Sequence, residues 1–296
     1  MDYIIKNSFL QVKIASKGAE VQSVKSLHSG YEYIWQADPK IWQRHAPILF
    51  PIVGRLKNDE YTYQGKTYHL TQHGFARDSE FSVEQQTAES ITFLLTDNEQ
   101  TRKVYPFSFE LRVNYNLLNN LLEENFSVHN KSDGEMIFGI GGHPGFNIPT
   151  SADLTKEDFY FSTKPSRARV RIPLNGQFLD WANRSLASTN SLITLSDHLF
   201  KDDALIFQMR GHDNRISLKT DANNFHVNVW LRDAPFVGVW SQYPQTADFV
   251  CIEPWWGIAD RTDTNQKLEE KYGMNHLAAG ATFTAGFSMA FHDKDE

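Results

Sequence analysis

The chain has 296 residues, of which 41% are hydrophobic and 22% charged, so it can bury a large core and is expected to fold as a globular protein. Its 29 Lys and Arg residues against 36 Asp and Glu give a net charge of −7 with no dense basic run, which argues against a nucleic-acid partner. The single cysteine, Cys251, excludes an intrachain disulfide, and no apolar stretch suits a signal peptide or a membrane span, so we expect a cytoplasmic protein without a membrane partner.

Alternation of apolar and polar residues predicts β-strands along most of the chain. In chain order, the clearest alternating runs are residues 10–16, 91–96, 109–118, 124–130, 215–220, 224–231 and 236–242. Gln64-Gly65-Lys66 and Asn119-Asn120 each lie between two such arms, and this spacing predicts two β-hairpins.

Helical signals are few and short. Asp38 followed by Pro39 predicts a turn that runs through Trp42. Residues 263–273 predict a helix that is capped by Asp263 or Thr264 and stopped by Gly273. Because alternating strand and helix patterns are missing, we expect an all-β antiparallel sandwich that forms a single domain over residues 1–296.

Glycine, proline, histidine and aromatic residues gather in segments 47–58, 72–78, 138–149 and 250–260. Such residues bend the chain where side chains are aimed into a cleft. His143 is flanked by glycines and by Pro144, and this setting suits an acid or base that acts near neutral pH. A histidine that is satisfied within a tight turn is the alternative interpretation.

Glu253 is the carboxylate with the most suggestive surroundings. If residues 249–253 form a strand, Phe249, Cys251 and Glu253 share one face, and the carboxylate emerges beside Trp255 and Trp256. Apolar walls raise the pKa of a carboxyl group, and an indole face can stack on the C–H surface of a sugar ring. An edge glutamate that pairs with an arginine is the competing interpretation.

Arg55 and His73 complete the candidate set, although each taken singly also suits a structural role. The guanidinium of Arg55 offers a rigid fork of donors for hydroxyl or carboxylate oxygens. Motifs for metal hydrolysis, phosphate-binding loops and serine hydrolysis are missing, so we expect neither a metal nor a cofactor. Cys251 is expected to be a small buried hydrophobe, and Arg77 to pair locally with Asp78.

Taken together, Arg55, His73, the GGHPGFN segment at 141–147 and the EPWWGIAD segment at 253–260 resemble the aldose 1-epimerase (galactose mutarotase) family. More narrowly, they resemble the branch whose members are often encoded with lactose and tagatose catabolism genes. The resemblance implies a β-supersandwich with a sugar-binding cleft on one sheet, no cofactor, and an isomerase that interconverts the α and β anomers of a hexose or hexose derivative.

By position, the resemblance matches Glu253 to the general base and His143 to the general acid, whereas Arg55 and His73 match residues that hold the sugar. Asp203 is the best match for an aspartate that binds ring hydroxyls. Glutamate and histidine suit the chemistry, since ring opening needs a base for the C1 hydroxyl proton and an acid for the ring oxygen, and we expect the two groups on different sides of the anomeric centre. We predict an ionised Glu253 that raises the pKa of a protonated His143, and therefore a bell-shaped pH–rate profile.

Two other functions stay open at this point. A glycoside hydrolase on a similar sandwich needs a second carboxylate, for which Asp203 and Asp260 are candidates. A non-catalytic sugar-binding or sensing protein would use the tryptophans and Arg55 for binding alone. The sequence leaves open the identity of the sugar and the oligomeric state. If the sugar is phosphorylated, the candidate cations for its phosphate are Lys57, Arg77 and Arg261.

Overall fold

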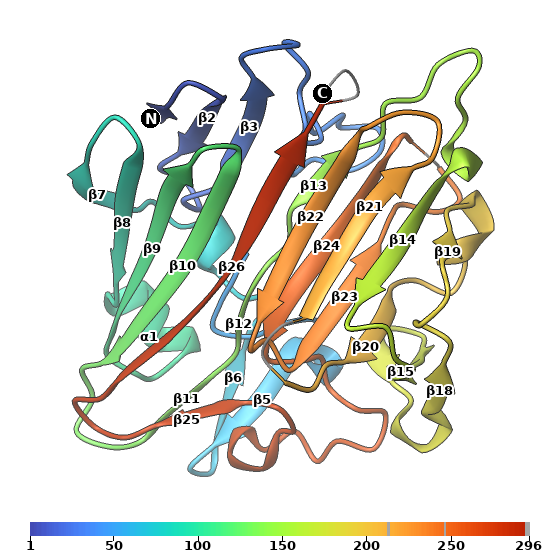
Figure 1. The fold of residues 1–296 in the computed structure, drawn as a ribbon. Coiled ribbons are helices and arrows are strands. Elements are labelled where there is room, and N and C mark those ends of the chain that lie inside the picture. The colour runs from blue at the N-terminus through green and yellow to red at the C-terminus, as the bar shows by residue number, and fades with distance from the viewer. Residues whose placement is uncertain (212–213, 246, 294–296) are drawn as a thin grey trace.

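The computed structural model describes residues 1–211, 214–245 and 247–293. Its largest element is a nine-stranded antiparallel sheet, which lies nearest the viewer in Figure 1. In sheet order the strands are β19 (Ile193–Thr194), β14 (Phe159–Lys164), β21 (Asn214–Thr220), β22 (His226–Arg232), β26 (Thr282–His292), β10 (Leu121–Asn130), β9 (Phe109–Leu118), β8 (Ser90–Thr96) and β7 (Ser82–Gln86).

A second antiparallel sheet lies behind the first (Figure 1). In sheet order its strands are β18 (Ser185–Ala187), β15 (Arg169–Ile172), β20 (Leu205–Gln208), β23 (Phe236–Trp240), β24 (Phe249–Trp256), β12 (Ile140–Gly142) and β4 (Ile48–Leu49). An eighth strand, β13 (Gly145–Asn147), continues beyond β12 and also pairs with β24. This second sheet carries the segments that the sequence singled out.

Smaller elements border the two sheets. A three-stranded sheet joins β1 (Asp2–Lys6), β2 (Leu10–Ala15) and β3 (Val21–Ser26). Three strand pairs are β5 (Glu60–Tyr63) with β6 (Lys66–His69), β11 (Met136–Phe138) with β25 (Asn275–Leu277), and β16 (Leu174–Asn175) with β17 (Phe178–Leu179). The helical segments are α1 (Glu99–Val104) and the 3-10 turns η1 (Lys57–Asp59), η2 (Ala76–Asp78), η3 (Lys156–Asp158), η4 (Trp181–Asn183), η5 (Asp197–Phe200) and η6 (Leu268–Glu270).

The core lies between the two large sheets and follows the predicted alternation. Val227 and Val229 of β22 are fully buried, and Val250 and Ile252 of β24 are fully buried in the same cluster. Burial of such side chains stabilises each sheet against its partner by about 1.5–3 kcal/mol per residue. The expected all-β antiparallel sandwich is confirmed, as are the two hairpins β5–β6 and β9–β10.

The predicted helix over residues 263–273 is wrong, because only the three-residue turn η6 forms there. The backbone of this segment bonds to another part of the chain: the amide of Thr62 donates to the carbonyl of Gln266 at 2.7 Å. Its Lys271 is buried against Asp260 instead of ending a helix. Conversely, α1 was not predicted, although Asn98 caps it through the amides of Gln100 and Thr101. The described residues contain no helix with the length and hydropathy that a membrane span requires.

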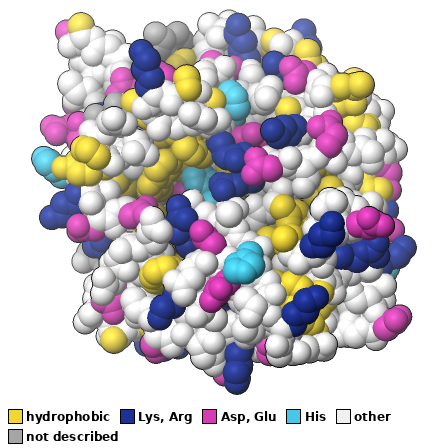
Figure 2. Space-filling view, turned by 180° about the vertical axis from the view of Figure 1, so that it is seen from behind, with side chains coloured by type: hydrophobic (Ala, Val, Ile, Leu, Met, Phe, Trp, Pro, Cys, Tyr) yellow, Lys and Arg dark blue, Asp and Glu magenta, His cyan; other side chains and the backbone are white. Residues whose placement is uncertain are grey.

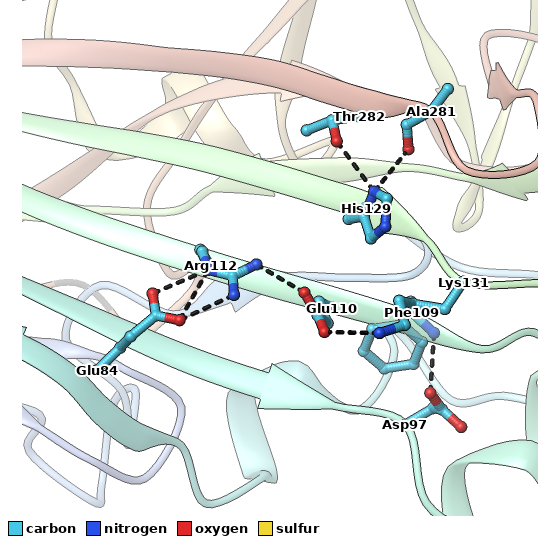
Figure 3. A network of polar contacts seen from close by, with 9 residues as sticks. All are labelled: Glu84, Asp97, Phe109, Glu110, Arg112, His129, Lys131, Ala281 and Thr282. Carbon is cyan, nitrogen blue, oxygen red and sulfur yellow. Dashed lines mark hydrogen bonds and ion pairs between the residues drawn. The ribbon is translucent and has the colours of Figure 1, made fainter.

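Charged side chains on the nine-stranded sheet point away from the core and neutralise one another (Figure 3). Arg112 of β9 contacts Glu84 of β7 at 2.8 Å and Glu110 of its own strand at 2.9 Å. Lys131 contacts Glu110 at 3.1 Å. These groups are partly exposed and paired, as expected for a solvated sheet face.

Candidate active site

His143 and Glu253 meet because of how three strands pair. The chain of β12 and β13 runs antiparallel to β24, with Gly141 opposite Trp255 and Gly145 opposite Cys251. His143 lies in the interruption between β12 and β13, so its side chain reaches the stretch of β24 that carries Glu253. The distance from His143 Nε2 to Glu253 Oε2 is 3.0 Å.

The face of β24 that carries Glu253 is set by strand alternation. Cys251, Glu253 and Trp255 share this face, whereas Ile252 and Trp256 belong to the core between the sheets. Gly238 of β23 lies opposite Glu253 and makes room for the indole of Trp255, since a Cβ atom there would be 2.4 Å from the ring. The indole N–H of Trp255 faces the Glu253 carboxyl without completing a hydrogen bond.

Burial dominates the electrostatics of the pair, since Glu253 is 1% exposed and His143 is 8% exposed. Burial raises the pKa of Glu253 well above its ordinary value, with the charge of Asp203 adding to the rise. Burial also lowers the pKa of His143 to about 3, and the positive charges of Arg77 and Arg44 act in the same direction. The prediction that the carboxylate raises the pKa of His143 is therefore wrong, because desolvation of the imidazolium outweighs its attraction to the carboxylate.

His73 lies next to the pair, with its ring centroid 5.5 Å from that of His143. The amide of Gly54 donates to Nδ1 of His73 at 3.1 Å, so the proton of the neutral ring lies on Nε2. Burial and the neighbouring cations hold the pKa of His73 well below its ordinary value. His73 is thus a neutral hydrogen-bond donor.

The turn that holds His73 needs the glycine that follows it. Both His73 and Gly74 have positive φ angles, of 67° and 71°. A Cβ atom on Gly74 would lie 2.3 Å from the carbonyl oxygen of Phe50. Backbone bonds from His73 to Gly54, and from Phe50 to His73, then fix the turn against the neighbouring segment.

Arg55 and Asp203 lie on loops at the rim of the site. The carbonyl of Arg55 accepts from the amide of Asp260 at 2.9 Å, and its guanidinium is 3.8 Å from the carboxylate of Asp59. Asp203 ends the turn after η5 with a positive φ of 71°, and its Oδ1 accepts from the amide of Ala204 at 2.8 Å. Burial raises the pKa of Asp203, although the bond from the Ala204 amide and the charge of Arg55 act in the opposite direction.

All six predicted site residues line one cavity of about 320 Å³. They are Arg55, His73, His143, Asp203, Glu253 and Trp255. Figure 2 shows this face of the molecule hollowed near its centre, with histidine at the floor, apolar side chains on one side and basic side chains on the other. The cavity joins a buried acid/base pair to an apolar wall and several hydrogen-bonding groups, as small-molecule sites usually do.

The structure adds lining residues that the sequence analysis missed. Trp42 stacks on His143 with a centroid distance of 5.1 Å, and Trp240 meets the same ring edge-on at 5.9 Å. Gln177 and Gln242 also line the cavity. No local pattern marks these residues, because they come from separate turns and strand ends that only the folded sheets bring together.

Other candidates lie elsewhere. Asp260 does not line this cavity: its Oδ1 is 2.7 Å from Lys271 Nζ, and both side chains are buried. Arg261 pairs with Asp263 at 2.6 Å. Of the three cations named as candidates for binding a phosphate, Lys57, Arg77 and Arg261, only Arg77 lines the cavity in the part of the chain that the structure describes. The predicted pair of Arg77 with Asp78 is present but long, at 3.9 Å, and Asp78 lies closer to Arg44, at 3.0 Å.

Comparison with known proteins finds relatives that match most of the chain. The aldose 1-epimerase family matches residues 1–273. Protein LacX of Lactococcus lactis subsp. lactis is 31% identical over 277 residues, which cover 90% of this chain and 91% of that protein.

Two solved structures share the fold over essentially the whole chain. The galactose mutarotase related enzyme from Lactobacillus acidophilus is 69% identical, with a TM-score of 0.99 and coverage of 100% of this chain and 99% of that one. A galactose mutarotase-like protein from Lactobacillus casei ATCC 334 is 30% identical, with a TM-score of 0.91 and coverage of 99% and 100%. On the family match, the chain belongs to the aldose 1-epimerase family.

Proposed function

We propose that the protein is an aldose 1-epimerase that interconverts the α and β anomers of a hexose or hexose derivative. The observation that carries this proposal is the 3.0 Å contact between His143 Nε2 and Glu253 Oε2 in the cavity. The hydroxyl oxygen and the ring oxygen of an anomeric centre are bonded to the same carbon. Two groups in mutual contact can therefore reach both oxygens at once, and they need not lie on opposite sides of the ring.

In the reaction, Glu253 accepts the proton of the C1 hydroxyl while His143 donates a proton to the ring oxygen. The bond from C1 to the ring oxygen breaks, and the C1–O1 bond becomes the carbonyl of an open-chain aldehyde. Rotation about C1–C2 followed by the reverse proton transfers closes the ring as the other anomer. Positioned proton transfer of this kind supplies about 10²–10⁴-fold in rate.

The pair must hold one transferable proton. Burial raises the pKa of Glu253 and lowers that of His143, so this proton rests on the carboxyl group before the sugar reacts. Transfer along the 3.0 Å contact then produces the carboxylate and imidazolium that the reaction uses. Because the two groups titrate together, the pH limits of the reaction belong to the pair.

The remaining lining residues would bind the sugar. His73 Nε2, Arg55 and Asp203 offer donors and acceptors for ring hydroxyls, and Trp255 offers an apolar face for C–H groups. A purely binding protein needs these groups alone. The buried acid/base pair, which is costly to desolvate, favours catalysis over sensing.

The hydrolase alternative is less well supported. Hydrolysis usually needs two carboxyl groups that flank the glycosidic bond. Asp260 forms an ion pair with Lys271 and does not line the cavity. Among the described lining residues, Asp203 is therefore the second carboxylate that a hydrolase would use with Glu253. Glu253 instead contacts a histidine.

Polarimetry on freshly dissolved α-glucose and α-galactose tests the proposal. We expect the protein to accelerate the decay of optical rotation far beyond the rate in buffer. Binding of sugar without acceleration would support the sensing protein instead, and release of free sugar from an aryl glycoside would support the hydrolase.

The pH dependence should reflect the buried pair. Below the lowered pKa of His143, about 3, both groups are protonated and no acceptor remains. Above the raised pKa of Glu253, the pair loses its proton and no donor remains. We therefore expect no fall in rate as the pH is lowered from neutral to about 5, and a fall as the pH rises through the raised pKa of Glu253. An acidic limb near the ordinary histidine pKa of about 6.5 would contradict this placement of the proton.

Cys251→Ser should leave turnover nearly unchanged. Cys251 is fully buried beside Glu253, and burial raises the pKa of its thiol well above the ordinary value, so no thiolate is available for attack. The measurement is the anomerisation rate at saturating sugar, with thermal unfolding to check the fold. Complete loss of turnover in a folded variant would show that the thiol takes part in the reaction.

A further inference from the structure

A thiol lies beside the proposed acid/base pair. Cys251 shares one face of β24 with Glu253, and it lies opposite Gly145, which follows His143 by two residues. Each of His143, Cys251 and Glu253 offers one potential metal-ligand atom, and the three atoms lie within 4.8 Å of one another. The proposed mechanism uses the imidazole and the carboxyl group and gives the thiol no part. The three residues together therefore have a chemistry that anomerisation does not account for.

Imidazole, thiolate and carboxylate form a ligand set typical of zinc. Zn²⁺ is usually tetrahedral, and its bonds to such ligands place the ligand atoms about 3.4–3.6 Å from one another. The present separations, which reach at most 4.8 Å, close to these values by side-chain shifts on the order of 1 Å. The hard cations Mg²⁺ and Ca²⁺ prefer oxygen ligands, so this set does not suit them.

Burial favours an ion whose charge the ligands cancel. Cys251 is fully buried, Glu253 is 1% exposed and His143 is 8% exposed. A thiolate and a carboxylate carry two negative charges, and a neutral imidazole carries none, so a divalent cation makes the buried centre neutral. The lowered pKa of His143 keeps its ring neutral and able to coordinate. Burial raises the pKa of the Cys251 thiol, but a coordinating metal ion removes that proton.

An ion can reach these ligands from the cavity. His143 and Glu253 both line the cavity, and Cys251 is buried beside them. Water from the cavity would complete a tetrahedron around an ion held by three side chains. Nδ1 of His143 is buried and has no hydrogen-bond partner among the described residues, so the ring has bonding capacity that the protein itself does not use.

We propose that His143, Cys251 and Glu253 bind a thiophilic divalent cation such as Zn²⁺, and that this ion inhibits the reaction. The ion forms one bond each to a ring nitrogen, the thiolate sulfur and a carboxylate oxygen. The thiol proton and the proton shared by the acid/base pair pass to solvent. Because the ion takes lone pairs that proton transfer needs, ion binding and turnover exclude each other. The inhibition rests on the proposed function, whereas the binding does not.

Absorption spectroscopy with Co²⁺ tests the binding directly. A bond between Co²⁺ and a thiolate gives a charge-transfer band in the near ultraviolet, and Cys251 is the single cysteine of the chain. We expect this band when the unmodified protein is titrated with Co²⁺, and excess Zn²⁺ should remove it by displacement. The band should be absent in Cys251→Ser. Its absence in the unmodified protein would overturn the inference, even if Cys251→Ser did not fold.

Inhibition of anomerisation by Zn²⁺ is the second test. Cys251→Ser should keep its turnover, but its inhibition constant for Zn²⁺ should be at least about tenfold higher, because a hydroxyl replaces the soft thiolate ligand. Mg²⁺ at the same concentration should not inhibit the unmodified protein. Equal inhibition of the unmodified protein and a folded Cys251→Ser variant by Zn²⁺ would overturn the inference.

His276→Gln is the matched control for zinc bound at the surface. His276 contacts Glu135 at 2.9 Å, and both side chains are exposed, so they offer an ion a histidine and a carboxylate without a thiol. Its inhibition constant for Zn²⁺ should equal that of the unmodified protein. Relief of inhibition in His276→Gln as large as in Cys251→Ser would overturn the assignment to the cavity. A protein that gives the Co²⁺ band but anomerises no sugar would support the metal site and contradict the proposed function.

Discussion

Glu253→Gln is expected to lower kcat for anomerisation by about 10²–10⁴-fold with a small change in KM. The substitution keeps the shape of the side chain but removes the group that accepts and returns the proton. Because the carboxyl is buried and burial favours its neutral form, the amide should fit the site without unfolding the protein. Saturation kinetics by polarimetry or exchange NMR measure both parameters.

Glu124→Gln is the matched control for this variant. Glu124 of β10 is also 1% exposed, and burial likewise raises its pKa well above the ordinary value, but it does not line the cavity. Its replacement should leave kcat nearly unchanged. If Glu253→Gln were folded and retained most of its turnover, Glu253 could not be the proton acceptor.

Lys271→Met should destabilise the protein by about 3–5 kcal/mol, because it leaves a buried carboxylate without its cation. Lys271 and Asp260 are both buried and are joined at 2.7 Å. The second oxygen of Asp260 accepts from the amide of Lys57 at 2.9 Å, and the amide of Asp260 bonds to the carbonyl of Arg55. The pair therefore also holds the loop that carries Arg55. Denaturant unfolding measures the loss.

Lys267→Met provides the comparison. Lys267 contacts Glu270 at 2.9 Å in the same segment, but both side chains are more than half exposed. Solvent screens such a pair, so its removal should leave the unfolding midpoint close to that of the unmodified protein. Equal losses of unfolding free energy in the two variants would mean that burial does not make the pair of Lys271 and Asp260 more stabilising than an exposed pair.

Much of the fold follows from alternation in the sequence. The run through Val227 and Val229 is predictable because its inward side chains are all apolar and its outward ones are polar except for Trp230, as one-sided burial favours. The segment 263–273 shows the limit of such reasoning. Its cap and stop residues suggest a helix, but contacts with Thr62 and Asp260, distant in sequence, override local preference.

The candidate site was predictable where residues are marked by their immediate neighbours. His143 stands between glycine and proline, and Glu253 stands beside two tryptophans, so both were identifiable before the fold was known. Trp42 and Trp240 were not, because nothing in their own segments indicates that they will enclose His143. Arg77 was predicted to pair with Asp78 and was also named as one of three candidate cations, but only the folded chain shows that it lines the cavity with Arg55.

The pKa values of His143 and Glu253 could not be predicted from the sequence for a physical reason. A glutamate near a histidine can raise or lower the histidine pKa, depending on whether charge attraction or desolvation is larger. The burial of His143 in the folded protein determines the direction of its pKa shift. That burial depends on how β12, β13 and β24 pair.

Exchange NMR at equilibrium, on glucose and glucose 6-phosphate labelled with ¹³C at C1, tests the central claim most directly. We expect exchange peaks between the α and β anomeric signals of at least one sugar when the unmodified protein is present. The same peaks should be absent with Glu253→Gln and in buffer alone. Sugar that binds in the cavity while its two anomeric signals exchange no faster than in buffer would contradict it.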